Sequence, residues 1–181
     1  MSRASDRAAR TTVALSLFLL AACRPAVGDG RRATAALADA GGRDVGTLTL
    51  RDAPGQPLTI EGELQGLPAG THGIHFHAVG QCDGSGAFAS AGAHFNPASR
   101  KHGLESPDGP HAGDLPNLVV GADGRATVRL TSSRVTLGRE AASLLDADGS
   151  AVVVHAAADD QRTDPSGNSG GRIACAVIAP R

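Results

Sequence analysis

The chain has 181 residues, among them 17 Lys and Arg, 18 Asp and Glu, 24 Gly and 10 Pro, and it contains no Trp or Tyr. This length is enough for one domain with a sizeable core and too short for two ordinary domains. The formal net charge of −1 and the lack of a basic patch exclude a protein that binds nucleic acid electrostatically. Frequent Gly and Pro favour short strands joined by turns over long helices.

The N-terminal segment predicts an exported protein. Three arginines precede an apolar run over residues 13–22, which is too short to span a bilayer as a mature helix and is typical of a signal peptide. The run ends in LAAC, so we expect residues 1–22 to be removed and Cys23 to become a lipidated first residue. That lipid would be the protein's membrane contact. The alternative is an ordinary secretory signal followed by an incidental cysteine.

A tether and one domain are expected next. Residues 23–32 carry Pro, Gly and Arg without hydrophobic periodicity, which indicates a flexible tether, and residues 33–181 form the domain. Removal of the signal takes away three Arg and one Asp, which leaves 14 basic and 17 acidic residues. Besides Cys23, only Cys82 and Cys175 remain, and an even pair of cysteines in an exported chain predicts a disulfide.

Eight segments show strand-like alternation or short apolar runs between turn residues. They are residues 33–39, 45–51, 57–65, 72–79, 117–121, 125–131, 151–156 and 172–178. This spacing predicts an all-β fold, an antiparallel sandwich or barrel. Two long segments, 80–116 and 157–171, interrupt the rhythm, and long irregular loops in a compact domain are usually functional. A third, residues 136–146, has a sequence compatible with one or two helical turns.

The seven histidines are concentrated, because none precedes residue 72. His75 and His77 have strand spacing, so both imidazoles leave one face and can reach one ion. Such a pair is weak by itself, since surface or packed histidines are commoner. His155 closes the apolar run AVVVH, where a lone histidine is more often structural. For His72 we expect a packed, hydrogen-bonded structural role.

The first long loop carries a more specific pattern. It contains three imidazoles and a carboxylate, a full tetrahedral set for zinc: His94, His102, His111 and Asp114. Imidazole-rich tetragonal sites suit copper(II), so the remaining histidines are compatible with a second metal.

At these residues the sequence resembles the copper/zinc superoxide dismutase family, in particular its exported, lipoprotein-like bacterial members. The segments HGIHFHA, AGAHFNPASRKH, GPHAGDLPN and GNSGGRIACAVI carry the resemblance, which covers nearly the whole expected domain. It implies an eight-stranded antiparallel Greek-key barrel with two long functional loops. It also implies dismutation of superoxide, a small anionic substrate, to dioxygen and hydrogen peroxide, with one copper and one zinc per subunit. A homodimer and a role in protecting the cell envelope, in the periplasm, are further expectations.

The resemblance assigns individual roles as well. Four histidines would bind copper: His75, His77, His94 and His155. Zinc would be bound by His94, His102, His111 and Asp114. His94 would bridge the metals and carry a proton during turnover, while Arg172 would dock the anion beside copper. Asp159 would hydrogen-bond one ligand of each metal, His75 and His102, although solvation is the ordinary role of an Asp in a polar loop.

One departure from the family concerns electrostatic steering. The 157–171 loop has no Lys, although many relatives use lysines there to attract superoxide, and its single basic residue is Arg162. Two other functions compete with the enzyme: a protein that stores or delivers copper or zinc, and an inactive adhesion or packing sandwich. Neither explains why an arginine-bearing GNSGGR segment accompanies a complete ligand set.

Overall fold

The structure, a computed structural model, describes residues 30–181. The predicted signal peptide, the lipidation site at Cys23 and most of the predicted tether lie outside the described residues. Within residues 30–181, no helix is long and apolar enough to cross a membrane.

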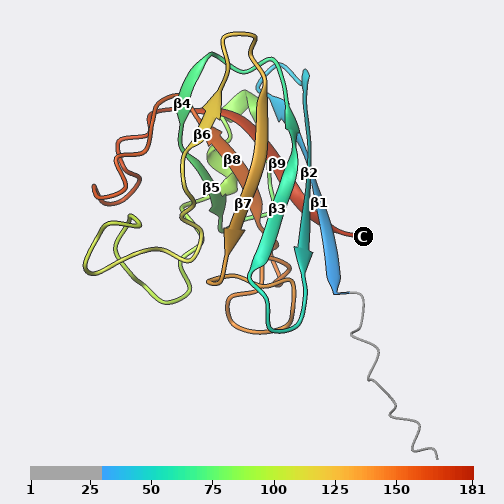
Figure 1. The fold of residues 1–181 in the computed structure, drawn as a ribbon, viewed down its shortest axis with the longest axis vertical. Helices are drawn as coiled ribbons and strands as arrows, with labels where there is room; N and C mark the ends of the chain where they lie inside the picture. Colours follow the sequence, from blue (N-terminus) through green and yellow to red (C-terminus); the bar gives the residue numbers. More distant parts are fainter. Residues whose placement is uncertain (1–29) are drawn as a thin grey trace, which may run out of the picture.

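The described residues contain nine strands and two short 3-10 helices (Figure 1). The elements are β1 (Arg31–Asp39), β2 (Asp44–Asp52), β3 (Leu58–Leu64), β4 (Gly70–His72), β5 (Ile74–His77), η1 (Gly84–Gly86), η2 (Ala89–Ala91), β6 (Leu118–Val120), β7 (Ala126–Ser132), β8 (Ala151–His155) and β9 (Arg172–Pro180). Seven strands form one antiparallel sheet in the order β5-β8-β9-β1-β2-β3-β7, and β4 pairs with β6. This arrangement confirms the predicted all-β antiparallel fold.

Alternation along the strands explains the core. In β7 the apolar Ala126 and Val128 are buried while Thr127 and Arg129 between them are exposed, so one face of the strand turns inward. β8 differs, because all five of its residues are buried. Val152 and Val154 join the main core, whereas Ala151 and Val153 pack in a second cluster with Phe88, Ala91 and Cys175. The segment 80–92 therefore covers the outer face of the sheet at β8.

The predicted strand 72–79 is in fact two strands, which raises the number from eight to nine. The chain leaves β4 at Gly73 and enters β5, which pairs with β8 instead of β6. A Cβ atom at Gly73 would lie 2.9 Å from the Cβ of Ser169 and 3.0 Å from Cε1 of His75. Glycine therefore lets the 157–171 loop approach this break closely. β1 also begins two residues earlier than predicted, at Arg31.

The helical turns expected at residues 136–146 are wrong, since the segment forms turns and bends. Thr136 explains this, because its amide donates to Ala142 O at 3.0 Å and its carbonyl accepts from the Leu144 amide at 2.9 Å. Leu137 and Leu144 are thereby buried in the main core. The two long loops, 80–116 and 157–171, project from the same side of the barrel (Figure 1).

Candidate metal centre

The paired strands β5 and β8 form the floor of the centre. His75 lies opposite Val153 and His77 opposite Ala151 in the antiparallel register. Directly paired residues share a face, so both imidazoles leave the outer face of the sheet, while Ile74 and Phe76 join the core. His155, at the end of β8, follows a register shift after Val154. Strand geometry thus brings together histidines that are eighty positions apart.

The loop residues are held against β5 by backbone hydrogen bonds. Phe76 donates its amide to Gly113 O at 2.9 Å and accepts at its carbonyl from the Phe95 amide at 2.8 Å. The Gly113 amide donates to Phe95 O at 2.8 Å, which ties the two loop segments to each other. His94, next to Phe95, forms an isolated β-bridge with His77. Asp114, next to Gly113, forms another with His75.

Three buried groups of metal-ligating side chains result among the described residues, and two of them contain every ligand predicted from the sequence, while the third joins His75, His102 and Asp159. The first cluster comprises His75, His77, His94 and His155, and the second comprises His94, His102, His111 and Asp114. Within each cluster, one ligand atom per residue lies within 4.8 Å of the others. His94 belongs to both clusters.

The tautomers of His77 and His155 leave two lone pairs facing each other. Nδ1 of His77 donates to Gly92 O at 3.0 Å, and Nδ1 of His155 donates to Gly170 O at 3.2 Å. Burial lowers the pKa of His155 to about 3, and burial also lowers the pKa of His77, so both rings are neutral at pH 7. Their Nε2 atoms are only 3.3 Å apart. Because both atoms are acceptors, they do not hydrogen-bond each other, and the pair is suited to binding one cation.

Four further ring nitrogens are buried without a hydrogen-bond partner among the described residues: His75 Nδ1, His94 Nε2, His102 Nδ1 and His111 Nδ1. The Nδ1 atoms of His102 and His111 lie 3.1 and 3.4 Å from Oδ1 of Asp114, without hydrogen-bond geometry. Buried polar atoms normally find partners, so a converging set without them fits a metal site. Imidazole nitrogens and a carboxylate are the donors that copper and zinc take.

Asp159 connects the two clusters. Its Oδ2 accepts from His75 Nε2 at 2.7 Å, and its Oδ1 accepts from His102 Nε2 at 3.0 Å. These are the bonds that the resemblance implied. They direct Nδ1 of both rings away from the carboxylate, and such bonds orient metal-binding imidazoles and raise their basicity.

Asn117 and Gln161 hold Asp159 in place, and the sequence analysis gave neither residue a role. Asn117 Nδ2 donates to Asp159 O at 2.8 Å, and Asn117 Oδ1 accepts from the Asp159 amide at 2.9 Å. The Gln161 amide donates to Oδ1 of Asp159 at 2.6 Å. The asparagine ends the segment GPHAGDLPN, so its position beside the zinc-type pattern was a signal that went unused.

Electrostatics make the centre selective for cations. Burial lowers the pKa of His75 to about 4, which leaves its lone pair free at neutral pH. Burial also lowers the pKa of His102, but the adjacent carboxylate of Asp114 and the hydrogen bond with Asp159 outweigh it and raise that pKa to about 9. Burial likewise raises the pKa of both carboxyls, yet hydrogen bonds from their histidine partners hold each well below its usual range. Two ionised carboxylates thus lie among mainly neutral imidazoles.

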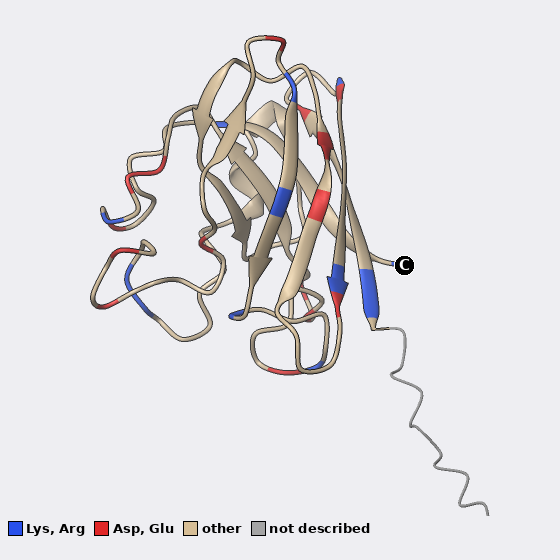
Figure 2. Ribbon diagram, in the orientation of Figure 1, with Lys and Arg blue, Asp and Glu red and all other residues tan. Residues whose placement is uncertain are grey.

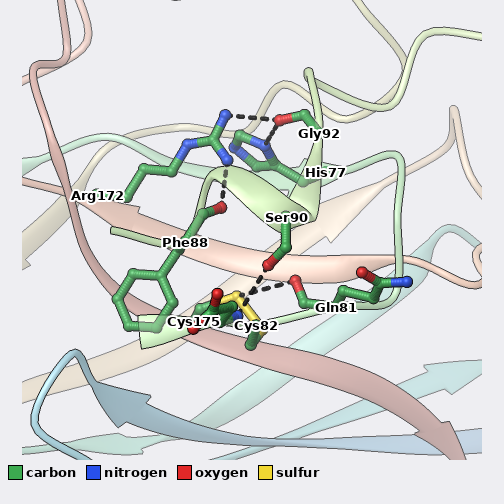
Figure 3. Close-up of a disulfide and its surroundings, with 9 residues drawn as sticks. His77, Gln81, Cys82, Phe88, Ser90, Gly92, Arg172 and Cys175 are labelled. Carbon is green, nitrogen blue, oxygen red and sulfur yellow. Dashed lines mark hydrogen bonds between the residues drawn. A yellow bond between two sulfur atoms is a disulfide. The ribbon is translucent and has the colours of Figure 1, made fainter. Parts of the chain in front are cut away.

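Arg172 lies beside the first cluster, next to a disulfide (Figure 3). The residue is paired with His155 in the sheet, and its guanidinium donates to Phe88 O at 2.5 Å and to Gly92 O at 2.6 Å. Cys82 and Cys175 form the predicted disulfide, with an S–S distance of 2.00 Å. The disulfide therefore ties the loop that holds the Arg172 side chain to β9, the strand that begins at Arg172.

Two predicted residues lie outside the clusters. His72 is buried, with Nδ1 2.8 Å from His155 O and Nε2 2.9 Å from Pro68 O, which confirms its structural role. Arg162 donates from Nε to Glu105 at 2.7 Å, and Lys101 pairs with Asp164 at 3.2 Å, so ion pairs connect the two long loops. Figure 2 shows that both loops carry charges of both signs. The cation of the 157–171 loop is thus neutralised by a partner.

Comparison with known sequences identifies the family. A sequence model described as copper/zinc superoxide dismutase (SODC) matches residues 45–178, most of the described chain. The chain belongs to the copper/zinc superoxide dismutase family. The members of this family use copper and zinc, and the chain is accordingly an oxidoreductase that dismutates superoxide.

Relatives and solved structures agree with this membership. The chain is 47% identical over 151 residues to a Cu-Zn superoxide dismutase of Caulobacter vibrioides, covering 81% of this chain and 84% of the relative. It is 43% identical over 123 residues to Cu-Zn superoxide dismutase 2 of Aquifex aeolicus, covering 67% and 71%. The crystal structure of a SOD-like protein from Bacillus subtilis superposes with a TM-score of 0.76 at 39% identity, covering 80% of this chain and 96% of that one. Membership of the dismutase family favours an enzyme over the two competing functions, a metal storage or delivery protein and an inactive sandwich.

Proposed function

We propose that the first cluster binds copper and the second binds zinc, with His94 shared between the metals. The observation that carries this assignment is the set of ring nitrogens without a partner. His75 offers Nδ1, while His77 and His155 each offer Nε2 because a backbone carbonyl takes the Nδ1 hydrogen. His102 and His111 offer Nδ1 beside Oδ1 of Asp114. Every residue of the first cluster therefore offers a ring nitrogen, whereas in the second cluster Nδ1 of His94 already lies 3.0 Å from Oδ1 of Asp114.

The two metals would have different roles. Copper would supply the one-electron redox couple for dismutation, whereas zinc has no redox chemistry. The overall reaction converts two superoxide anions and two protons into dioxygen and hydrogen peroxide. The residues of the chain must therefore attract an anion, hold it at the copper cluster and deliver protons.

Arg172 attracts and docks the anion. Its guanidinium stays charged at any physiological pH, and the two carbonyl acceptors occupy one N–H on each terminal nitrogen, which leaves further donors for superoxide. Fixed positive charge in a cleft raises association rates by roughly 10- to 1000-fold, a range to which superoxide dismutase is itself a contributing example.

His94 supplies a proton during turnover. Its Nδ1 lies 3.0 Å from Oδ1 of Asp114, while its Nε2 is buried without a partner among the described residues. Nδ1 therefore faces the zinc cluster, and Nε2 is the atom that holds the proton and passes it to the reduced oxygen species. The carboxylate of Asp114 keeps the ring oriented while Nε2 changes its protonation.

Metal analysis of three single variants tests the ligand sets. We expect His77→Ala to lose copper and keep zinc, His111→Ala to lose zinc and keep copper, and His94→Ala to disturb both metals. Mass-spectrometric metal counts and superoxide decay would be measured on each purified protein. Loss of both metals from His77→Ala alone, or retention of both by His94→Ala, would contradict the assignment.

We also infer an exported, lipid-anchored enzyme of the bacterial periplasm and cell envelope. The bacterial relatives and the disulfide support export, since disulfides persist in oxidising compartments. Residues 1–22 would be the signal, Cys23 the lipidated residue, 23–32 the tether and 33–181 the dismutase domain. Cys23→Ser should release the protein from washed membranes, and a wild-type protein already soluble after export would exclude the anchor. Sedimentation of the metallated protein tests the expected homodimer.

A further inference from the structure

Arg134 lies outside both clusters but contacts a proposed zinc ligand. The residue follows β7, and its amide donates to Ser132 Oγ at 3.2 Å. Its side chain extends to the first long loop, where Nη2 donates to the carbonyl oxygen of Asp114 at 2.6 Å. It also lines a pocket with Pro110 and Ala112 of that loop. The sequence analysis gave Arg134 no role.

The environment of Arg134 is unusual for a cation that serves only as a tether. Its Nε is buried without a hydrogen-bond partner, and among residues 30–181 no carboxylate lies within 4.0 Å of its guanidinium. Burial lowers the pKa of Arg134, while the Asp114 carboxylate acts in the opposite direction. Partly buried charges are unfavourable unless compensated, and a neutral side chain is able to donate to a carbonyl without that penalty. Among residues 30–181, the bond to the Asp114 carbonyl is therefore the one side-chain hydrogen bond that holds this guanidinium.

The hydrogen bonds of the Asp114 carboxylate all come from its own loop, and one of them joins Oδ1 to Nδ1 of His94 at 3.0 Å. Oδ2 accepts from the Gly103 amide at 2.8 Å and from the His111 amide at 2.9 Å. These donors belong to the same loop as Asp114, and neither lies on a strand of the barrel. Phe76 holds the preceding residue, Gly113, to β5. Arg134 adds a contact from the opposite side, at the ligand residue itself.

We propose that Arg134 is a positioning residue for the zinc site, which fixes Asp114 relative to the barrel through its backbone carbonyl. This inference rests on the zinc set proposed above. It assigns a function to a residue of the β7 side of the barrel, far in sequence from the loop that carries the zinc ligands.

The test compares Arg134→Met, Arg134→Lys and a control, Arg100→Met. Arg100 also donates from its guanidinium to a backbone carbonyl of the same loop, Gly109 O at 3.1 Å, but Gly109 is not a ligand. Zinc affinity would be measured by competition with a chelator, and cobalt(II) in the zinc site would report ligand geometry through its absorption spectrum. We expect Arg134→Met to weaken zinc binding about 10- to 100-fold and to shift the cobalt spectrum, since partners of metal ligands act at this scale. Arg134→Lys should fall between Arg134→Met and the parent, and Arg100→Met should match the parent.

Zinc affinity of Arg134→Met and Arg134→Lys equal to that of the parent would overturn the proposal. So would an equal loss in Arg100→Met with an unshifted cobalt spectrum, because a general tether of the loop would then explain the effect. If Arg134→Met fails to fold, the zinc affinity and the cobalt(II) absorption spectrum of Arg134→Lys test the proposal by themselves. Failure of the ligand assignment is distinguishable, because His111→Ala would then keep zinc in an otherwise unaltered protein.

Discussion

Arg172 and His77 donate hydrogen bonds to the same acceptor, the carbonyl oxygen of Gly92, at 2.6 and 3.0 Å. One peptide group therefore fixes the distance between the docking cation and a proposed copper ligand (Figure 3). The same bond selects the tautomer of His77, because a carbonyl accepts only from a protonated Nδ1. A single backbone position thus sets the place of Arg172, the proposed docking residue, and the donor atom that His77 would offer to copper.

Replacement of Arg172 should slow the enzyme without removing its metals. We expect Arg172→Gln to lower the rate of superoxide decay about tenfold or more and to flatten its dependence on ionic strength, since steering contributes at least this factor. Pulse radiolysis across a salt series measures both effects. Unchanged rates at matched copper and zinc content would show that Arg172 does not guide the substrate.

Arg162 should contribute little to steering, because Glu105 neutralises it. The two side chains are 72% and 55% exposed, and exposed pairs of this kind contribute about 0 to 1 kcal/mol. The double variant Arg162→Gln with Glu105→Gln keeps the net charge of the parent and should keep its rate and salt dependence. A salt dependence as flat as that of Arg172→Gln would instead identify Arg162 as a second guiding cation.

Asp159→Asn should weaken the binding of both metals about 10- to 100-fold. The carboxylate accepts from His75 and His102 at once, whereas an asparagine amide offers one acceptor and places a donor against the other ring. The matched control is Asp160→Asn, at an exposed neighbour that binds Thr163 and Asn168. Chelator competition with each metal measures the effect, and equal affinities in the two variants would exclude a special role for Asp159.

Gly167→Ala should destabilise the protein more than Gly170→Ala. Both glycines have positive φ, 63° and 77°, so alanine carries a similar backbone penalty of about 1 kcal/mol at each. A methyl group at Gly167 would overlap Oδ1 of Asp159, whereas at Gly170 the nearest atom is 3.6 Å away. We expect an additional loss of about 1 to 3 kcal/mol in Gly167→Ala, as overpacking produces, together with weaker metal binding. Urea unfolding of the metal-free proteins measures the difference, and identical midpoints would refute the clash.

Removal of the disulfide should lower the free energy of unfolding on the order of 4 kcal/mol. Cys82 and Cys175 are 93 residues apart, and in the chain-entropy model a cross-link of this span strongly restricts the unfolded chain. The comparison is between the parent and the double variant Cys82→Ser with Cys175→Ser, both metal-free, by urea unfolding. A midpoint unchanged at equal slope would contradict the expected stabilisation.

The sequence predicted the antiparallel fold and the pairing of His75 with His77 because both depend on local spacing, whereas His155 joined the copper set only through the family resemblance. Period-two alternation located β7, and the strand spacing of His75 and His77 placed them on one face. Alternation does not encode which strand becomes the partner, so the change of pairing at Gly73 was not predictable. The contacts of Asn117 with Asp159 and of Arg134 with Asp114 span 42 and 20 residues, and no local pattern marks them. Arg162 looked like a free cation, because its partner Glu105 lies 57 residues away.

The disulfide also bears on catalysis. Cys82 belongs to the segment whose Phe88 and Gly92 carbonyls hold Arg172, and Cys175 lies three residues beyond Arg172 on β9. Reduction of this one covalent bond would free the segment that carries both carbonyl partners of Arg172, the proposed docking residue. We therefore expect a thiol reductant to slow superoxide decay at unchanged metal content, in addition to lowering the stability of the fold.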